Sequence, residues 1–122
     1  MRAAGLHPIE TILSSQAVLI QSSKPKDPAN APLIKMITSR IAGVLAASKY
    51  ILCTYNIKRD LVSEATKITP GRRAATITTL EEDGWVAVNA MLLKSESADI
   101  MDRLVALGAQ DVFTTGLENC RV

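Results

Sequence analysis

The sequence predicts an α+β fold, because segments with strand and helix periodicity alternate along most of its 122 residues. Between residues 49 and 122 the predicted order is β-α-β-β-α-β, which is the ferredoxin-like arrangement. The hydrophobic content of 48% is enough to form a core in a chain of one domain's length. A Pro-Gly-Arg-Arg bend at residues 70–73 separates the first helix of this arrangement from its second strand.

Two strands, a loop and a helix are predicted before this arrangement. Short apolar runs at residues 7–13 and 16–21 are separated by two serines, which predicts strand, turn and strand. Three prolines between residues 22 and 32 predict a surface loop. From Pro32 to Ala47 apolar residues recur at helical spacing, which predicts an amphipathic helix. We therefore divide the chain into three sections, residues 1–23, 24–48 and 49–122.

Six elements are predicted in the third section: strands over 49–56, 74–80, 85–93 and 110–115, and helices over 59–67 and 95–107. Ser95 or Ser97 is expected to cap the second helix, and Gly108 is expected to end it. Right-handed crossovers place both helices on one face of the sheet. Because the strands are apolar on both sides, we expect the second face to pack against another chain or domain.

The Pro-Gly-Arg-Arg bend is the most informative motif. Proline fixes φ and glycine tolerates positive φ, so the chain is expected to reverse at Pro70-Gly71. Arg72 and Arg73 then place two guanidinium groups beside the bend, where they are suited to bind an anion or a carboxylate. The alternative is a solvated turn before a strand.

Composition excludes several classes of function. A net charge of +2, with one Trp, two Tyr and one Phe, argues against a nucleic-acid-binding surface. The two cysteines, Cys53 and Cys120, lack metal-ligand spacing and indicate a reduced, cytoplasmic protein. No uninterrupted apolar stretch approaches the ~20 residues of a membrane span, so no membrane partner is expected.

Catalytic patterns are absent from the sequence. It contains no Ser-His-Asp, GxSxG, Walker or HExxH pattern, and the single histidine, His7, has no ligand or acid nearby. The acidic turn at residues 81–83 provides too few converging oxygens for a metal ion, and a solvated hairpin turn is the preferred interpretation. We therefore assign no catalytic residue and no metal site. The residues alone indicate a ligand-binding or oligomerising module.

The string Ile-Thr-Pro-Gly-Arg-Arg-x-x-Thr-Ile at residues 68–77 resembles the C-terminal regulatory domain of long-form ATP phosphoribosyltransferases. Segments at residues 39–44, 49–52, 83–88, 99–104, 107–109 and 119–121 resemble the same family in order and spacing. The start of the chain resembles the segment after the family's phosphoribosyl-diphosphate loop. The chain is therefore expected to be a C-terminal fragment, with residues 1–23 as a two-strand remnant of the catalytic domain and residues 24–48 as a bridging helix and its linker.

This resemblance implies a glycosyltransferase of histidine biosynthesis, which transfers a phosphoribosyl group from phosphoribosyl diphosphate to N1 of ATP with the help of Mg²⁺. It also implies feedback inhibition by histidine in a cytoplasmic hexamer, while the fragment alone is expected to be inactive. Position by position, the resemblance places histidine at Asn56, Arg72, Thr76, Met91 and Asp111. The alternative is a free-standing regulatory module that binds a small ligand and oligomerises without enzymatic activity.

Overall fold

The computed structural model describes residues 7, 9–24 and 27–121. The chain forms two compact units, Met1–Asn30 and Ala31–Val122.

The first unit does not contain the expected hairpin. Its described residues between 9 and 24 form no strand, whereas the sequence predicted two; part of the first predicted strand, at position 8, lies outside the described residues. Ile9 and Ile12 are each 97% exposed, so no core holds this segment. A lone two-stranded hairpin is marginal in water, which explains why apolar alternation did not suffice here. The unit ends in a short 3₁₀ helix, Pro28–Asn30, where the Asp27 carboxylate accepts a hydrogen bond from the Ala29 backbone N–H at 2.9 Å.

Helix α1 spans Ala31–Lys49 and confirms the predicted helix. Its large apolar side chains remain between 37% and 59% exposed, and only Gly43 and Ala47 are buried. Among the described residues, Pro28–Lys49 is the one helical segment long and apolar enough to cross a membrane, by length and composition alone. No apolar stretch of this length was predicted from the sequence, because Lys35 and Arg40 interrupt the apolar run. Core helices of soluble proteins meet the same criterion, so α1 carries no argument for a membrane.

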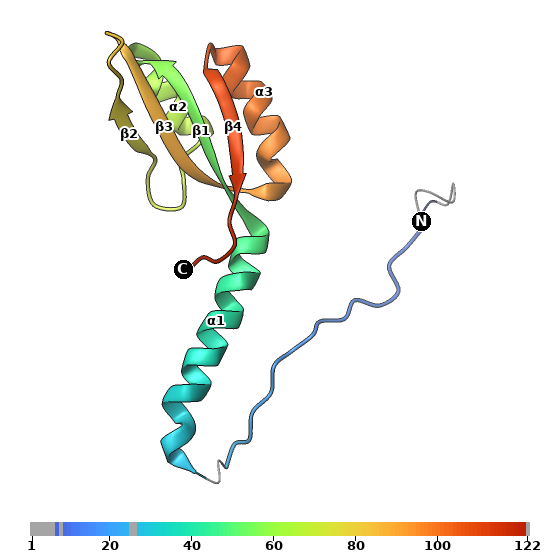
Figure 1. Ribbon diagram of the computed structural model, residues 1–122. Helices are drawn as coiled ribbons and strands as arrows, with labels where there is room; N and C mark the ends of the chain where they lie inside the picture. Colours follow the sequence, from blue (N-terminus) through green and yellow to red (C-terminus); the bar gives the residue numbers. More distant parts are fainter. Residues whose placement is uncertain (1–6, 8, 25–26, 122) are drawn as a thin grey trace. The chain divides into compact units, whose positions relative to one another are not determined.

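The second unit contains a four-stranded antiparallel sheet in the order β2-β3-β1-β4, as Figure 1 shows. The strands are β1 (Tyr50–Lys58), β2 (Thr76–Thr79), β3 (Trp85–Leu93) and β4 (Gln110–Gly116). Helices α2 (Val62–Ile68) and α3 (Ser97–Leu107) each follow a single 3₁₀ turn and lie on the same face of the sheet. The β-α-β-β-α-β order, and with it the ferredoxin-like class, is confirmed.

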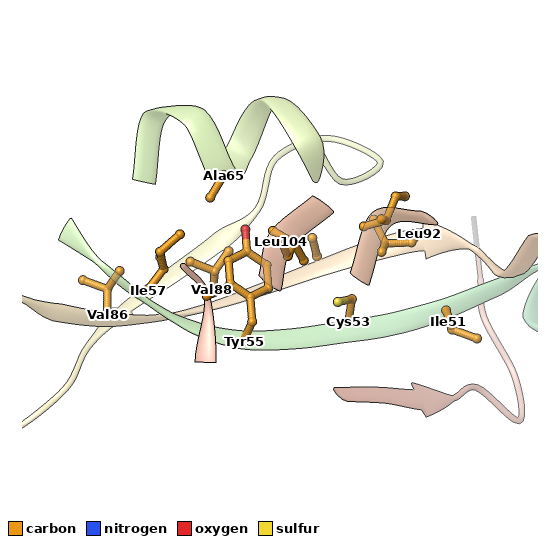
Figure 2. Packing of buried hydrophobic residues seen from close by; sticks show 12 residues of the cluster. Ile51, Cys53, Tyr55, Ile57, Ala65, Val86, Val88, Leu92 and Leu104 are labelled. Atoms are coloured by element: carbon orange, nitrogen blue, oxygen red, sulfur yellow. The ribbon is translucent and has the colours of Figure 1, made fainter. Parts of the chain in front are cut away.

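The core lies between this sheet and the two helices. Alternate residues of the central strands are buried there, among them Ile51, Tyr55 and Val88 in Figure 2. Ala65 of α2 and Leu104 of α3 close the core from above. The strand residues between these buried positions point to the other side of the sheet, called here the open face, and are only half-buried in β1 and β3.

The ends of α3 differ in how well the sequence predicted them. Glu96 occupies the N-cap and makes no side-chain cap, so the expectation of a capping Ser95 or Ser97 is wrong. The Ser97 hydroxyl instead donates to the Lys94 carbonyl at 2.9 Å, because the preceding 3₁₀ turn places that carbonyl within reach. Gly108 ends the helix with a φ of 103°, as predicted for a left-handed C-terminal glycine.

Candidate ligand-binding site at the Pro-Gly-Arg-Arg loop

The open face brings together side chains from three strands in one row. Thr76 on β2 is opposite Asn89 on β3, which is opposite Thr54 on β1. The Thr54 hydroxyl donates to the Asn89 side-chain oxygen at 2.6 Å. This bond uses the amide oxygen of Asn89 and leaves its two amide hydrogens available as donors.

The Pro-Gly-Arg-Arg loop begins at a buried anchor. Thr69, the last residue before the loop, is fully buried and accepts a hydrogen bond from the Tyr55 hydroxyl at 2.7 Å. Its own hydroxyl donates to the Ala65 carbonyl at 3.1 Å, which leaves Tyr55 as the donor in the first bond. Two residues later Gly71 adopts a φ of 64°, in the left-handed region that favours glycine. The bend is confirmed, and its position is set by the core.

Beside this loop lies a hollow of about 310 Å³ on the open face. We call it the loop hollow, and it is lined by Leu52, Arg72, Arg73, Ala74, Thr76, Asn89, Met91, Cys120 and Arg121. The structure thus brings three of the five predicted ligand residues, Arg72, Thr76 and Met91, to one place. Among the residues that the structure describes, the lining contains three arginines and no carboxylate, together with hydroxyl and amide donors. Such a lining favours an anionic group.

The other two predicted residues form a separate pair. The Asn56 side-chain amide donates to the Asp111 carboxylate at 3.0 Å. The pair sits where the β1–β4 register shifts, between Thr54 and Asn56, and Asp111 has a φ of 49°. Bulges and positive φ at non-glycine residues cost energy and concentrate at functional sites. The Asp111 carboxylate keeps further acceptor positions for a cation or an N–H group.

These two groups lie toward opposite edges of the sheet. Thr76 is on edge strand β2 and Asp111 is on edge strand β4, which are separated by β3 and β1. Three strand spacings of about 4.8 Å give a separation of roughly 14 Å, which exceeds the length of one amino acid. Within one chain, therefore, the five residues do not form a single site.

Sequence reasoning did not assign Leu52, Ala74, Asn89, Cys120 or Arg121 to the site, and it gave Arg73 an anion-binding role without naming it among the five ligand residues. Asn89 carried a signal, since it is the one polar residue inside an apolar strand of nine residues. Arg73 was visible beside Arg72 in the loop motif. Cys120 and Arg121 carried no local signal, because only the folded chain brings the C-terminus to this face.

A second cleft, of about 520 Å³, lies between the C-terminal end of α2, the loop and the first half of α3. It shares Arg72 and Met91 with the loop hollow. Its lining mixes cations such as Lys67 and Arg103 with the carboxylates of Glu96 and Asp99. This mixture selects less clearly for an anion than the loop hollow does.

No catalytic or metal centre emerges from residues 7, 9–24 and 27–121. These residues contain no group of three or more His, Cys, Asp or Glu side chains able to hold a metal ion. The acidic turn at residues 81–83 is exposed, and its carboxylates do not form such a group. Burial raises the pKa of the Cys53 thiol, which keeps it protonated and unsuited to nucleophilic chemistry. No Mg²⁺ site is identified among the described residues.

Comparison with known proteins gives consistent matches. Residues 47–119 match the family described as HisG, C-terminal domain. An ATP phosphoribosyltransferase of Yarrowia lipolytica is 52% identical over 122 residues, which is 100% of this chain and 40% of that protein. The enzymes of Candida glabrata and Saccharomyces cerevisiae are 50% and 45% identical, again over 100% of this chain and 40% of each protein.

This chain therefore spans about 40% of the length of the relatives it matches. The family match covers the four strands, α2, α3 and the Pro-Gly-Arg-Arg loop. It thus includes the whole sheet and most of the loop hollow. From the fold, the loop and these matches together, we conclude that the chain belongs to the family of HisG C-terminal domains.

Proposed function

We propose that this chain is the histidine-sensing part of an ATP phosphoribosyltransferase. The observation that carries the proposal is the loop hollow, where Arg72, Thr76 and Met91 meet and where the described lining residues include three arginines and no carboxylate. Arg72 and Thr76 would bind the α-carboxylate of histidine, and Met91 would pack on the imidazole ring. The ATP phosphoribosyltransferase names of the relatives support the same assignment.

We assign a separate role in the complete protein to each of the three sections of this chain. Residues 1–23 are the end of the catalytic part, residues 24–48 are the linker and bridging helix, and residues 49–122 sense histidine. The complete protein would transfer a phosphoribosyl group to N1 of ATP with Mg²⁺, in the cytoplasm, whereas this chain alone is inactive. Incubating the chain with ATP, phosphoribosyl diphosphate and Mg²⁺ should yield no product.

The separation of the two groups of predicted residues favours a homo-oligomer. Asp111 on β4 is about three strand spacings from Thr76 on β2, and Asn56 on β1 is about two, so one copy cannot surround a histidine with all of them. Two copies can do so if the Asn56–Asp111 pair of one faces the loop hollow of the next. The carboxylate of Asp111 would then receive the ammonium or imidazole N–H groups. We propose that the complete enzyme is a hexamer in which neighbouring copies make this contact.

Mixing variants tests the shared site. Chains with Thr76→Ala and chains with Asp111→Ala should each bind histidine poorly. An equimolar mixture should regain part of the binding, because some contacts between the two variants combine two intact halves. Binding that stays absent in the mixture, while the mixed oligomers form, would contradict a site shared between copies.

Inhibition of the complete enzyme tests the regulatory role. Thr76→Ala should raise the histidine concentration needed for half-inhibition about tenfold or more, as expected for the loss of one hydrogen bond to a charged group. Thr78→Ala is the matched control, since Thr78 is also exposed on β2 and does not line the hollow. Equal inhibition of both variants and the parent would remove Thr76 from the site. If the parent chain assembles but does not bind histidine, the alternative of a regulatory module for another small ligand is favoured.

A further inference from the structure

The last residues of the chain connect the loop hollow to helix α1. The segment after β4, residues 117–121, is called here the C-terminal tail, and it runs from the sheet to the side of α1 in Figure 1. Cys120 and Arg121 line the loop hollow together with Arg72, Thr76 and Met91. The same two residues hydrogen-bond α1.

Two bonds hold the tail on the helix. The Cys120 backbone N–H donates to the Gly43 carbonyl at 3.0 Å. The Arg121 guanidinium donates through Nη1 to the Ser39 hydroxyl at 3.2 Å. Ser39 and Gly43 are one helical turn apart, so the tail is attached to α1 along one side.

Gly43 permits this close approach. A Cβ atom at position 43 would lie 2.6 Å from the Asn119 side-chain oxygen and 3.3 Å from the Cys120 carbonyl oxygen. The Asn119 side chain would have to rotate away, and the tail backbone would have to shift. Glycine inside a helix costs about 1 kcal/mol relative to alanine, so its presence here is consistent with a packing requirement.

Arg121 has the chemistry to bind an anionic ligand. Its guanidinium carries five N–H donors, and the bond to Ser39 uses one of them. Arg121 lines the hollow together with Arg72 and Arg73, and no described residue of the lining carries a carboxylate. A planar guanidinium can bind a carboxylate through two parallel bonds.

We propose that the C-terminal tail is a movable wall of the loop hollow, in which Arg121 binds the ligand's carboxylate and the tail transmits occupancy to α1. This proposal rests on the proposed function, since it takes histidine as the ligand. Ligand bonds to Arg121 stabilise the tail in its position on Ser39 and Gly43. A change that lowers the population of the tail-bound state lowers the apparent affinity for a ligand that binds this state.

The two cysteines make the tail directly observable. Cys120 is half-buried in the tail, whereas Cys53 is fully buried in the core and is the internal control. The rate at which a maleimide labels Cys120 should fall severalfold when histidine saturates the chain, while Cys53 stays unlabelled under native conditions. Histidine affinity, measured by calorimetry, should fall about tenfold in Arg121→Gln.

A pair of glycine substitutions tests the attachment to α1 without removing any ligand contact. Gly43→Ala should speed the labelling of Cys120 and lower histidine affinity, and Gly43→Leu should do both more strongly. Gly116→Ala is the matched control, because a Cβ atom there meets nothing within 4 Å. Circular dichroism verifies that each variant keeps its fold.

The outcomes separate this inference from the proposed function. If histidine binds, but neither Arg121→Gln nor Gly43→Leu changes its affinity and Cys120 labels at one rate throughout, the tail has no part in the site and the inference is overturned. The proposed function then stands. If calorimetry shows no histidine binding to the assembled chain, both are overturned.

Discussion

The hydrogen-bonded chain from Tyr55 through Thr69 to the Ala65 carbonyl offers a sharp test of how the core positions the loop. Tyr55 and Thr69 are both fully buried, and their oxygen atoms are 2.7 Å apart. Thr69→Val removes the one acceptor that the described residues offer to the Tyr55 hydroxyl, and it leaves that donor buried without a partner. Tyr55→Phe removes one bond but leaves Thr69 free to donate to Ala65.

The two variants should therefore differ in cost. An unpaired buried donor costs about 1–3 kcal/mol, whereas the loss of one satisfied bond costs about 0.5–1.5 kcal/mol. Thr69→Val should thus destabilise more than Tyr55→Phe. The double variant should cost less than the sum of the two, because without the tyrosine hydroxyl no orphaned donor remains.

Urea unfolding followed by the fluorescence of Trp85, the one tryptophan, measures these costs. Thr66→Val is the matched control, since its hydroxyl donates within α2 to the Val62 carbonyl at 2.9 Å and is linked to no buried tyrosine. It should change the free energy of unfolding by less than about 0.5 kcal/mol. A cost for Tyr55→Phe equal to or above that for Thr69→Val, or strict additivity, would refute the reasoning.

Three further predictions concern pH, the loop and the core. Burial raises the pKa of Cys53 above 9.0 and that of Tyr55 above 10.0, so the folded chain keeps protons that the unfolded chain releases. The free energy of unfolding should fall as pH rises above about 9. In Cys53→Ala this free energy should depend less on pH where the fall begins. A free energy of unfolding that does not change with pH in the parent chain would contradict this. Gly71 has a φ of 64°, and a Cβ atom there would lie 3.0 Å from the Ala74 carbonyl oxygen, so Gly71→Ala should lower the free energy of unfolding in urea by about 1–2 kcal/mol. Gly116→Ala, where a Cβ atom meets nothing within 4 Å, should not lower it. Equal losses for the two variants would argue against strain in the loop. Leu104→Ala, at a fully buried position, should cost about 2–5 kcal/mol in the same assay, and a cost below 1 kcal/mol would place Leu104 outside the core.

Periodicity predicted the centre of the sheet well because the central strands β1 and β3 each bury one face in this chain. Strand β3 was predicted at 85–93 and has those bounds, since its alternating residues pack on α2 and α3. The same type of signal failed at residues 9–21, where apolar residues have nothing to pack against in this chain. An apolar pattern indicates which face of a segment has to be buried, but it does not indicate whether the chain provides a surface that covers this face.

The candidate site was predictable only in part for a related reason. The Pro-Gly-Arg-Arg motif and the family resemblance identified Arg72, Thr76 and Met91, which do meet in the loop hollow. Motifs act locally, however, and the placement of Arg121 depends on where α1 and β4 direct the tail. The bulge beside Asp111 depends equally on the register between β1 and β4, which no residue near it specifies alone.

The central claim is that the loop hollow binds histidine, and isothermal titration calorimetry of L-histidine into the purified 122-residue chain tests it most directly. We predict a saturable heat that Thr76→Ala removes or weakens by about tenfold or more and that Thr78→Ala leaves unchanged. The absence of heat in the folded, oligomeric parent chain, or the same binding curve for the parent and Thr76→Ala, would contradict the claim.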